Sequence, residues 1–302
     1  MELKVENIFK SFGEKEVLKD ISISAQSGTA LGLLGRNGAG KTTTIRIIMG
    51  VFFADKGKVL IDGKPIDRDN IRIGYMPEER GLYPKIKICD QMVYLAQLRG
   101  MSLKDAQKAC DKWLERMSMT EYKNKKLETL SKGNQQKIQL AVTLMCNPQI
   151  VILDEPFSGL DPVNAMLLKD VIKEMISGGA IVLFSSHQMN YIEEFCESIS
   201  IINRGKIAID GKISEIKHSY PRDRIAVTSS QYEKIAPFVL QKMSDNITDV
   251  KNDGENTLII KMKSPDFKNR LFAKLSEFDI DCFKVCEPSL NDIFVEYTEG
   301  GI

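Results

Sequence analysis

Short apolar runs of strand length alternate with helical patterns over residues 1 to about 84, and again over residues 150–215. Such runs, bounded by Gly, Asn and Asp, are typical of buried strands. Strands that alternate with helices predict a mostly parallel sheet covered on both faces. The predicted elements are strands at 3–8, 17–23, 29–34, 58–61, 65–66, 150–153 and 180–185, helices at 42–49, 162–176 and 188–196, and a hairpin over 199–209.

The intervening residues have a different pattern. Residues 90–98 and 103–117 carry apolar side chains at spacings of three and four, as amphipathic helices do. We therefore expect one α/β domain over residues 1–215, with a helical subdomain inserted at about residues 85–147.

A separate unit is predicted after about Ser219. Its pattern runs strand, helix, strand, strand, helix, strand and a final helix. That order fits a small ferredoxin-like α+β sandwich, which we expect over residues 220–302. The elements are strands at 224–228, 247–252, 257–262 and 281–286, and helices at 231–243, 265–278 and from 289 onward.

The composition indicates the cellular compartment of the protein and excludes some classes of partner. The net charge of +1 does not indicate a nucleic-acid-binding protein. No run approaches the roughly 18 apolar residues of a membrane span, and the N-terminus lacks the pattern of a signal peptide. The 6 cysteines are scattered without a CxxC pair, which indicates reduced structural thiols and no zinc site. We therefore expect a cytoplasmic protein.

The strongest chemical motif is the segment 35–42, Gly-Arg-Asn-Gly-Ala-Gly-Lys-Thr, which matches GxxxxGK[ST]. Its glycines let backbone N–H groups wrap a triphosphate, and the following helix directs its positive end at the same anion. We expect Lys41 to bridge the β- and γ-phosphates, and Thr42 to bind Mg²⁺. The residues expected to hold ATP here are Gly35, Asn37, Gly38, Ala39, Gly40, Lys41, Thr42 and Thr43.

Two carboxylates follow the apolar strand at 150–153. Asp154 and Glu155 lie where α/β sheets place their ligands, at the carboxyl end of a strand. Asp154 is expected to hold Mg²⁺, and Glu155 to accept a proton from the water that attacks the γ-phosphate. An apolar run that ends in Asp-Glu can equally be a strand entering a turn, so the assignment depends on the phosphate-binding loop.

The segment 130–136, Leu-Ser-Lys-Gly-Asn-Gln-Gln, resembles the LSGGQ signature of ABC ATPases. Three further positions are similar to landmarks of that family, in the same order along the chain. Phe12 stands where the family stacks an aromatic ring on adenine, the segment 158–161 resembles the D-loop that ends in Asp161, and His187 resembles the switch histidine that senses the γ-phosphate. The resemblance covers residues 1 to about 215.

The resemblance implies a mechanism. Two such domains close head to tail, and the signature helix of one copy would present Ser131 and Gly133 to the γ-phosphate of ATP held by the other copy. Asp161 would lie in the same composite site. Ser131 can also be read as a plain helix N-cap, and His187 as a structural histidine.

Some positions depart from the commonest family pattern. Lys132 and Asn134 replace a glycine and a glutamine of the signature, and Glu78 stands where a glutamine usually reaches Mg²⁺. The segments 77–84 (PEERGLYP) and 288–294 (PSLNDIF) resemble the ATPases of ABC-2-type exporters, which include sodium and drug efflux systems. The second segment also fits a terminal helix that packs on its own domain.

The sequence thus predicts a P-loop NTPase of the ABC ATPase type. We expect a subunit, working as a homodimer, that binds ATP and Mg²⁺, hydrolyses ATP and powers a separate membrane permease, peripheral on the inner face of the cell membrane. The permease would choose the substrate, and no nucleic acid is expected as a partner.

Two alternatives stay open. Non-transport ABC proteins of translation usually carry two ATP domains, and those of DNA repair carry a long coiled coil, whereas this chain has a single phosphate-binding loop and no sustained heptads. An unrelated P-loop kinase or GTPase would not need the segment 130–136, and no NKxD motif occurs. The C-terminal unit could be regulatory, could dimerise or could brace the ATP domain.

Overall fold

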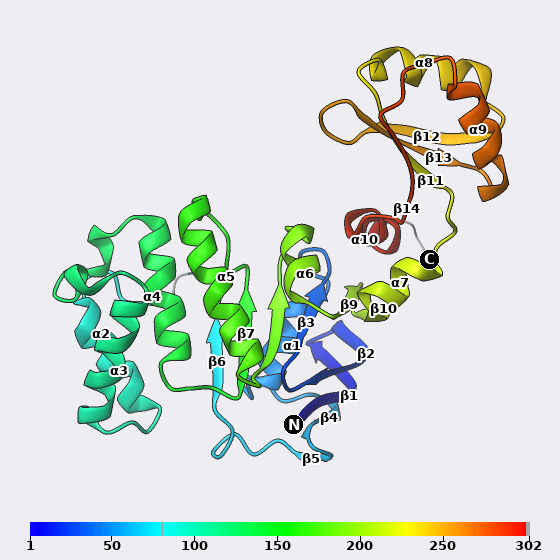
Figure 1. Cartoon of the computed structure of the whole chain (residues 1–302). Helices are drawn as coiled ribbons and strands as arrows, with labels where there is room; N and C mark the ends of the chain where they lie inside the picture. Colours follow the sequence, from blue (N-terminus) through cyan, green and yellow to red (C-terminus); the bar gives the residue numbers. More distant parts are fainter. Residues whose placement is uncertain (80, 300–302) are drawn as a thin grey trace. The chain divides into compact units, whose positions relative to one another are not determined.

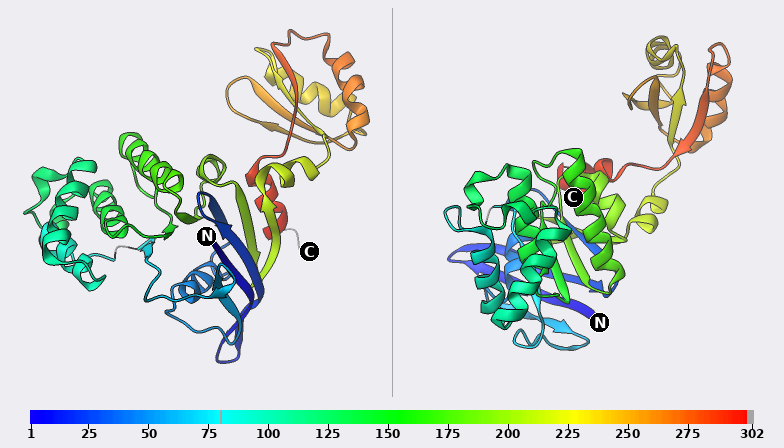
Figure 2. Two further views of the ribbon diagram at one scale, coloured as in Figure 1. Left: turned by 60° about the horizontal axis from the view of Figure 1, so that its bottom comes forward. Right: turned by 60° about the vertical axis from the view of Figure 1, so that its left-hand side comes forward.

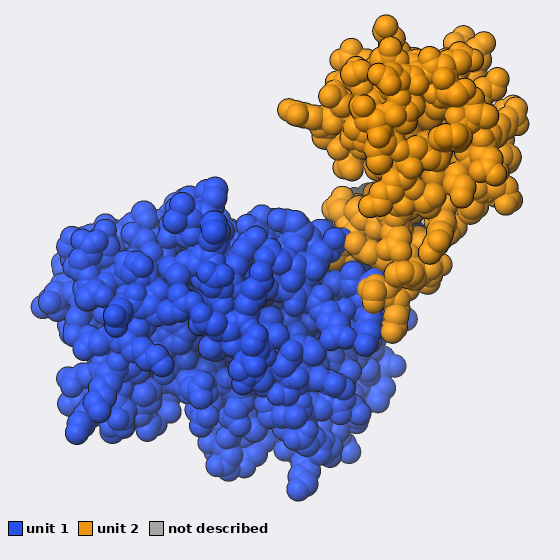
Figure 3. All heavy atoms as spheres, in the orientation of Figure 1, with its two compact units in different colours: residues 1–213, 296–302 blue, residues 214–295 orange. Residues whose placement is uncertain are grey.

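The structure is a computed structural model that describes residues 1–79 and 81–299 (Figure 1). The described chain divides into two compact units, Ser214–Val295 and Met1–Ile213 together with the chain from Glu296 onward (Figure 3). The domain limits predicted from the sequence, 1–215 and 220–302, differ from this division at the end of the chain. Arg80 of the PEERGLYP segment and the last residues of the second predicted domain, 300–302, lie outside the described residues.

The first unit contains a central sheet with the strand order β10-β9-β3-β8-β7-β6. All neighbouring strands in it are parallel except β10 and β9, which confirms the predicted mostly parallel sheet. The most apolar strands, β3, β7 and β8, are buried along their whole length. The strands are β3 (Ala30–Leu34), β6 (Ile73–Met76), β7 (Ile150–Asp154), β8 (Ile181–Ser185), β9 (Ser198–Asn203) and β10 (Lys206–Lys212).

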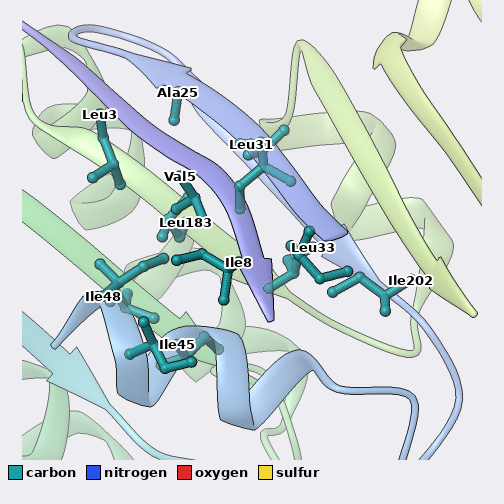
Figure 4. Packing of buried hydrophobic residues seen from close by; sticks show 14 of the residues in the cluster. Leu3, Val5, Ile8, Ala25, Leu31, Leu33, Ile45, Ile48, Leu183 and Ile202 are labelled. Carbon is teal, nitrogen blue, oxygen red and sulfur yellow. The ribbon is translucent and has the colours of Figure 1, made fainter. Parts of the chain in front are cut away.

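A second, antiparallel sheet contains the other strands near the N-terminus, in the order β2-β1-β4-β5. The sequence pattern gave no sign that these strands lie apart from the parallel sheet. Helix α1 (Lys41–Ile48) shares one apolar core with both sheets, through Ile45, Ile47 and Ile48 (Figure 4). The strands of this sheet are β1 (Glu2–Phe12), β2 (Lys15–Gln26), β4 (Lys56–Ile61) and β5 (Lys64–Pro65).

The predicted helical insert is present, and two views show its helices gathered beside β6 (Figures 1 and 2). Its helices are α2 (Ile88–Leu98), α3 (Leu103–Arg116), η1 (Thr120–Tyr122), η2 (Leu127–Thr129) and α4 (Lys132–Leu144). Helices α5 (Pro162–Ser177) and α6 (Met189–Phe195) follow β7 and β8, as predicted. Within residues 1–79 and 81–299, every helix is too short or too polar to traverse a lipid bilayer.

The second unit has its own sheet, in the order β12-β13-β11-β14, with antiparallel neighbours throughout. This order, with a helix between β11 and β12 and another between β13 and β14, is that of the predicted ferredoxin-like sandwich. The predicted helix over 265–278 is shorter, because a 3-10 turn takes up its start. The elements from Ile213 onward are α7 (Ile213–Ser219), β11 (Arg224–Thr228), α8 (Tyr232–Lys242), β12 (Ile247–Asn252), β13 (Thr257–Met262), η3 (Pro265–Phe267), α9 (Lys268–Leu275), β14 (Cys282–Cys286) and α10 (Leu290–Glu299), whose last turn belongs to the first unit.

Candidate functional site

The segment between β3 and α1 forms the predicted phosphate-binding loop, and two of its glycines are required by its backbone conformation and packing. Gly35 adopts φ 152°, and a Cβ atom there would lie 2.4 Å from the Ile202 carbonyl oxygen. Gly40 adopts φ 122° and a Cβ atom there would lie 2.5 Å from Leu18 Cδ2. L-residues avoid these backbone angles, and the neighbours leave no room for a side chain. Glycine at both positions therefore lets the loop pack tightly against its neighbours and place its backbone N–H groups next to the start of α1.

Lys41 begins α1 and folds back over this loop. Its Nζ donates to the Gly35 carbonyl oxygen at 2.5 Å and to the Arg36 carbonyl oxygen at 3.4 Å. Burial lowers the pKa of Lys41, whereas the nearby carboxylates of Asp154, Glu155 and Glu78 act in the opposite direction. The ammonium thus lies between the loop and a group of acids, where a phosphate oxygen could replace the carbonyl acceptors.

Asp154 ends β7 with its carboxylate held by hydroxyl groups. Ser185 Oγ, at the end of the neighbouring β8, donates to Asp154 Oδ1. Tyr75 on β6 donates its hydroxyl to Oδ2 at 3.5 Å. Burial raises the pKa of Tyr75 to about 12, and the charge of Asp154 adds to the rise. Adjacent parallel strands therefore orient this carboxylate at the carboxyl edge of the sheet.

Glu155 is 7% exposed and adopts φ 50°, which turns the chain away from β7. Ser186 Oγ donates to Glu155 Oε2 at 3.2 Å, and His187 Nε2 lies 3.8 Å from Glu155 Oε1. Burial raises the pKa of the Glu155 carboxyl, while His187 and the Ser186 hydroxyl partly offset that rise. A carboxylate with a raised pKa is a better proton acceptor than an exposed one.

These groups meet around a cavity of about 580 Å³. Hydroxyl and carboxylate oxygens are the ligands that Mg²⁺ prefers, and the ion usually takes only one or two of them from protein. Thr42, Glu78 and Asp154 all line the cavity and so fit that ion. The predicted residues that line it are Asn37, Gly38, Gly40, Lys41, Thr42, Thr43, Glu78, Asp154, Glu155 and His187.

The remaining predicted site residues do not line this cavity. Gly35 and buried Ala39 shape the loop from behind. Phe12, at the end of β1, is 45% exposed and has its ring centroid 5.3 Å from that of Phe52. Two of the other residues cap helices: Ser131 accepts from the Asn134 N–H at 3.3 Å, and Asp161 accepts from the Asn164 N–H at 2.9 Å.

Gly133 lies at the start of α4 and faces α5. A Cβ atom at Gly133 would lie 3.2 Å from Asn164 Nδ2 and 3.4 Å from Leu160 Cδ2. The predicted signature segment and the predicted D-loop are therefore packed against each other within one copy. A side chain larger than hydrogen at this position would press on their contact.

Sequence reasoning missed several residues around the cavity. Ser185 and Ser186, which hydrogen-bond to Asp154 and Glu155, were foreseeable, because these two hydroxyl residues lie at the end of an apolar strand and precede His187. Lys15, at the start of β2, and Arg204, in the turn between β9 and β10, also line the cavity. Pattern alone gives no sign that these residues approach the phosphate-binding loop.

Comparison with protein families matches two parts of the chain. The family described as ABC transporter matches residues 18–158, and the family described as ATP-binding protein DrrA1-3-like, C-terminal domain, matches residues 211–298. The first match includes the phosphate-binding loop and the acidic pair. The second includes the ferredoxin-like unit.

Relatives match over nearly the whole chain. The chain is 40% identical to the ABC transporter ATP-binding protein YhaQ of Bacillus subtilis (strain 168), covering 97% of each. It is 30% identical to the linearmycin resistance ATP-binding protein LnrL of the same organism, covering 98% of each. A solved structure described as the ATP-binding subunit of an ABC transporter superposes with a TM-score of 0.67 at 27% identity, covering 72% of this chain and 93% of that one.

Proposed function

Since this chain belongs to the ABC transporter ATP-binding proteins, we propose that it hydrolyses ATP to power a separate membrane permease, as the subunit of an exporter. Family membership makes it the ATP-binding subunit of an ABC transporter. The observation that carries the hydrolytic proposal is the convergence of Lys41, Asp154 and Glu155 on one cavity.

Each group at the cavity has a role that its surroundings support. The loop N–H groups and Lys41 bind the triphosphate, because they present donors and a cation to it. Buried Glu155 accepts the proton of the attacking water, and His187, 3.8 Å away, orients that carboxylate or contacts the γ-phosphate. Thr42, Glu78 and Asp154 would hold Mg²⁺, which supplies charge neutralisation to the phosphates when bound.

The second half of the ATP site comes from another copy of the chain in this proposal. Ser131, Gly133 and Asp161 lie away from the cavity of their own copy, although the family resemblance assigns them to ATP. The exposed start of α4 is free to meet a phosphate across an interface. A head-to-tail homodimer that closes on ATP reconciles these facts, since each ATP would then contact both copies.

The permease is proposed to dock on the helical insert around residues 78–100. Apolar side chains stand exposed there, among them Tyr94 at 53% and Leu98 at 66%. Gln91 is buried and fixes the preceding segment, because its side chain accepts from the Tyr83 N–H at 3.1 Å. Exposed apolar groups on a fixed frame suit a protein interface. The chain would then work at the inner face of the cell membrane.

The export direction rests on the C-terminal unit. Residues 211–298 match the DrrA-like C-terminal domain, and a relative that aligns over 98% of the chain is named for linearmycin resistance. Removal of a toxic compound is one way to confer resistance. We accordingly propose an efflux system of the ABC-2 type, whose permease selects the substrate.

Nucleotide binding and hydrolysis are tested with two substitutions. Lys41→Ala should abolish retention of ATP-Mg²⁺, measured by titration with a fluorescent ATP analogue. Glu155→Gln should retain ATP, lose most hydrolysis and accumulate as an ATP-bound dimer in size-exclusion chromatography. Glu79→Gln, at an exposed position outside the cavity, is the matched control. A Glu155→Gln variant that hydrolyses ATP like the control would contradict the assigned role.

Docking is tested with a pair of equally exposed residues in the same insert. Tyr94→Asp should prevent co-purification with a polytopic membrane protein, while Leu103→Asp, which is also 53% exposed in the native chain, should not. ATP binding should be unchanged in both variants. Recovery of only ribosomal or DNA-repair proteins with the unmodified chain would instead favour the non-transport class of ABC ATPases.

A further inference from the structure

The helical insert contains a cluster of sulfur atoms that the ATPase does not use. Cys110, on α3, donates its thiol hydrogen to Cys89 Sγ at 3.5 Å and lies with its own Sγ 3.9 Å from Met92 Sδ. Cys89 and Met92 are one turn apart on α2, so both face α3. Two sulfur atoms of α2 thus lie against the Cys110 thiol of α3.

The cluster is shielded from water on most sides. Cys110 and Met92 are 0% exposed, and Cys89 is partly exposed. The partly exposed thiol gives a route of entry to the cluster, while the other two sulfur atoms form its buried wall. Apolar surroundings of this kind protect a bound soft ion from exchange with water.

The spacing suits a metal ion with three sulfur ligands. A metal–sulfur bond of about 2.3 Å, as for zinc thiolates, requires sulfur separations of about 4.0 Å in a trigonal plane. The Cys89–Cys110 and Cys110–Met92 separations, 3.5 and 3.9 Å, need to widen by about 0.5 and 0.1 Å to reach that value. We propose that Cys89, Cys110 and Met92 form a site for a soft monovalent cation of the Cu(I) class.

The ligand set selects among metals. Thiolate and thioether sulfur prefer Cu(I), whereas zinc requires four ligands of the thiolate, imidazole or carboxylate type. Over the described part of the chain, His, Cys, Asp and Glu side chains do not gather in groups of three or more that could hold a metal. A zinc site therefore lacks ligands here, whereas the thioether of Met92 is a suitable third ligand for a softer ion.

The charge of the loaded site is balanced nearby. Binding one Cu(I) releases two thiol protons to solvent, forms two thiolate bonds and one thioether bond, and moves no electrons. The product carries one net negative charge. Lys123, whose ammonium pairs with Asp111 on α3, is adjacent to the cluster, because its carbonyl oxygen accepts from the Cys89 N–H at 3.0 Å. Its ammonium, shared with Asp111, would offset part of that charge.

The experiment titrates the full-length chain, without oxygen, with Cu(I) supplied as the complex of a coloured competing chelator. The native chain should take one Cu(I) per chain at this site. Cys89→Ser and the volume-conserving Met92→Leu should each weaken binding at least about 10-fold, since even indirect ligand contacts contribute that much. Cys89→Ser also avoids the buried Cys110, whose replacement could disturb folding.

Cys146→Ser is the matched control, because Cys146 Sγ lies 3.6 Å from Met101 Sδ and, within the part of the chain that the structure describes, has no second thiol in contact with it. This variant should bind Cu(I) like the native chain. The proposal is overturned if the native chain leaves all copper with the chelator, or if the control loses as much affinity as Cys89→Ser.

Discussion

The substitution Gly35→Ala tests whether the phosphate-binding loop is held by the neighbouring sheet. An alanine at Gly35 would have to keep φ 152°, a backbone angle almost confined to glycine, at an energy of about 1–3 kcal/mol. Its Cβ atom would also lie 2.4 Å from the Ile202 carbonyl oxygen, so β3 and β9 would have to move apart. Overpacking of this kind costs about 1–3 kcal/mol. The sum is about 2–6 kcal/mol.

Gly38 in the same loop provides the comparison. It adopts φ 79°, yet a Cβ atom there would have nothing within 4 Å. Gly38→Ala should therefore destabilise the chain by only about 1–2 kcal/mol, the value for a left-handed residue with a side chain. Because Gly38 lines the cavity, we expect a methyl group added there to weaken ATP binding. The two variants should thus separate stability from affinity.

Urea unfolding without nucleotide, followed by circular dichroism, measures the stability difference. With a denaturant slope of about 3 kcal/mol per M, Gly35→Ala should lower the transition midpoint by roughly 0.7–2 M and Gly38→Ala by roughly 0.3–0.7 M. Titration with a fluorescent ATP analogue measures affinity in the folded variants. Equal midpoint shifts, or a larger shift for Gly38→Ala, would refute the argument that contact with Ile202 fixes the loop.

Three further outcomes are expected. Ser185→Ala should lower the unfolding free energy by about 1–3 kcal/mol, because the buried Asp154 carboxylate loses a donor; an unchanged urea midpoint would speak against this. Because burial raises the pKa of Glu155, its base form is lost as the pH falls through that pKa. Steady-state ATPase rates should therefore fall at a higher pH than they would with an exposed carboxyl as the base. A flat profile of rate against pH would count against Glu155 as the base. Phe12→Ala should weaken ATP binding by at least about 0.5–1.5 kcal/mol in nucleotide titrations if the ring stacks on adenine, and equal affinity would exclude stacking.

Most of the fold could be predicted because its elements have strong local patterns. The strands 247–252 and 257–262 were predicted with the bounds that the structure gives, since both segments are rich in Ile, Val and Thr and are separated by the turn residues Asp253 and Gly254. Strand β6 (Ile73–Met76) escaped prediction because it is short and contains Gly74. A Cβ atom at Gly74 would lie 2.7 Å from the Thr143 carbonyl oxygen, so tertiary packing demands the glycine.

The candidate site likewise contains residues that the sequence could predict and residues that it could not. The phosphate-binding loop and the acidic pair are contiguous in sequence and follow apolar strands, and their spacing therefore carried the prediction. Tyr75, Lys15 and Arg204 join the site through sheet order and turn placement. Those relations involve residues far apart in the chain, which periodicity cannot report.

Helix α1 has apolar contacts to two sheets at once, and this affects the thermodynamics of ATP binding. A loop anchored on both sides loses little freedom when ATP arrives, so the entropy of association should be mainly that of the ligand itself. Calorimetry of nucleotide binding to the monomer should accordingly reveal a small change in heat capacity, because little apolar surface leaves water at that step. A large negative change in heat capacity would mean that the phosphate-binding loop becomes ordered only when ATP binds.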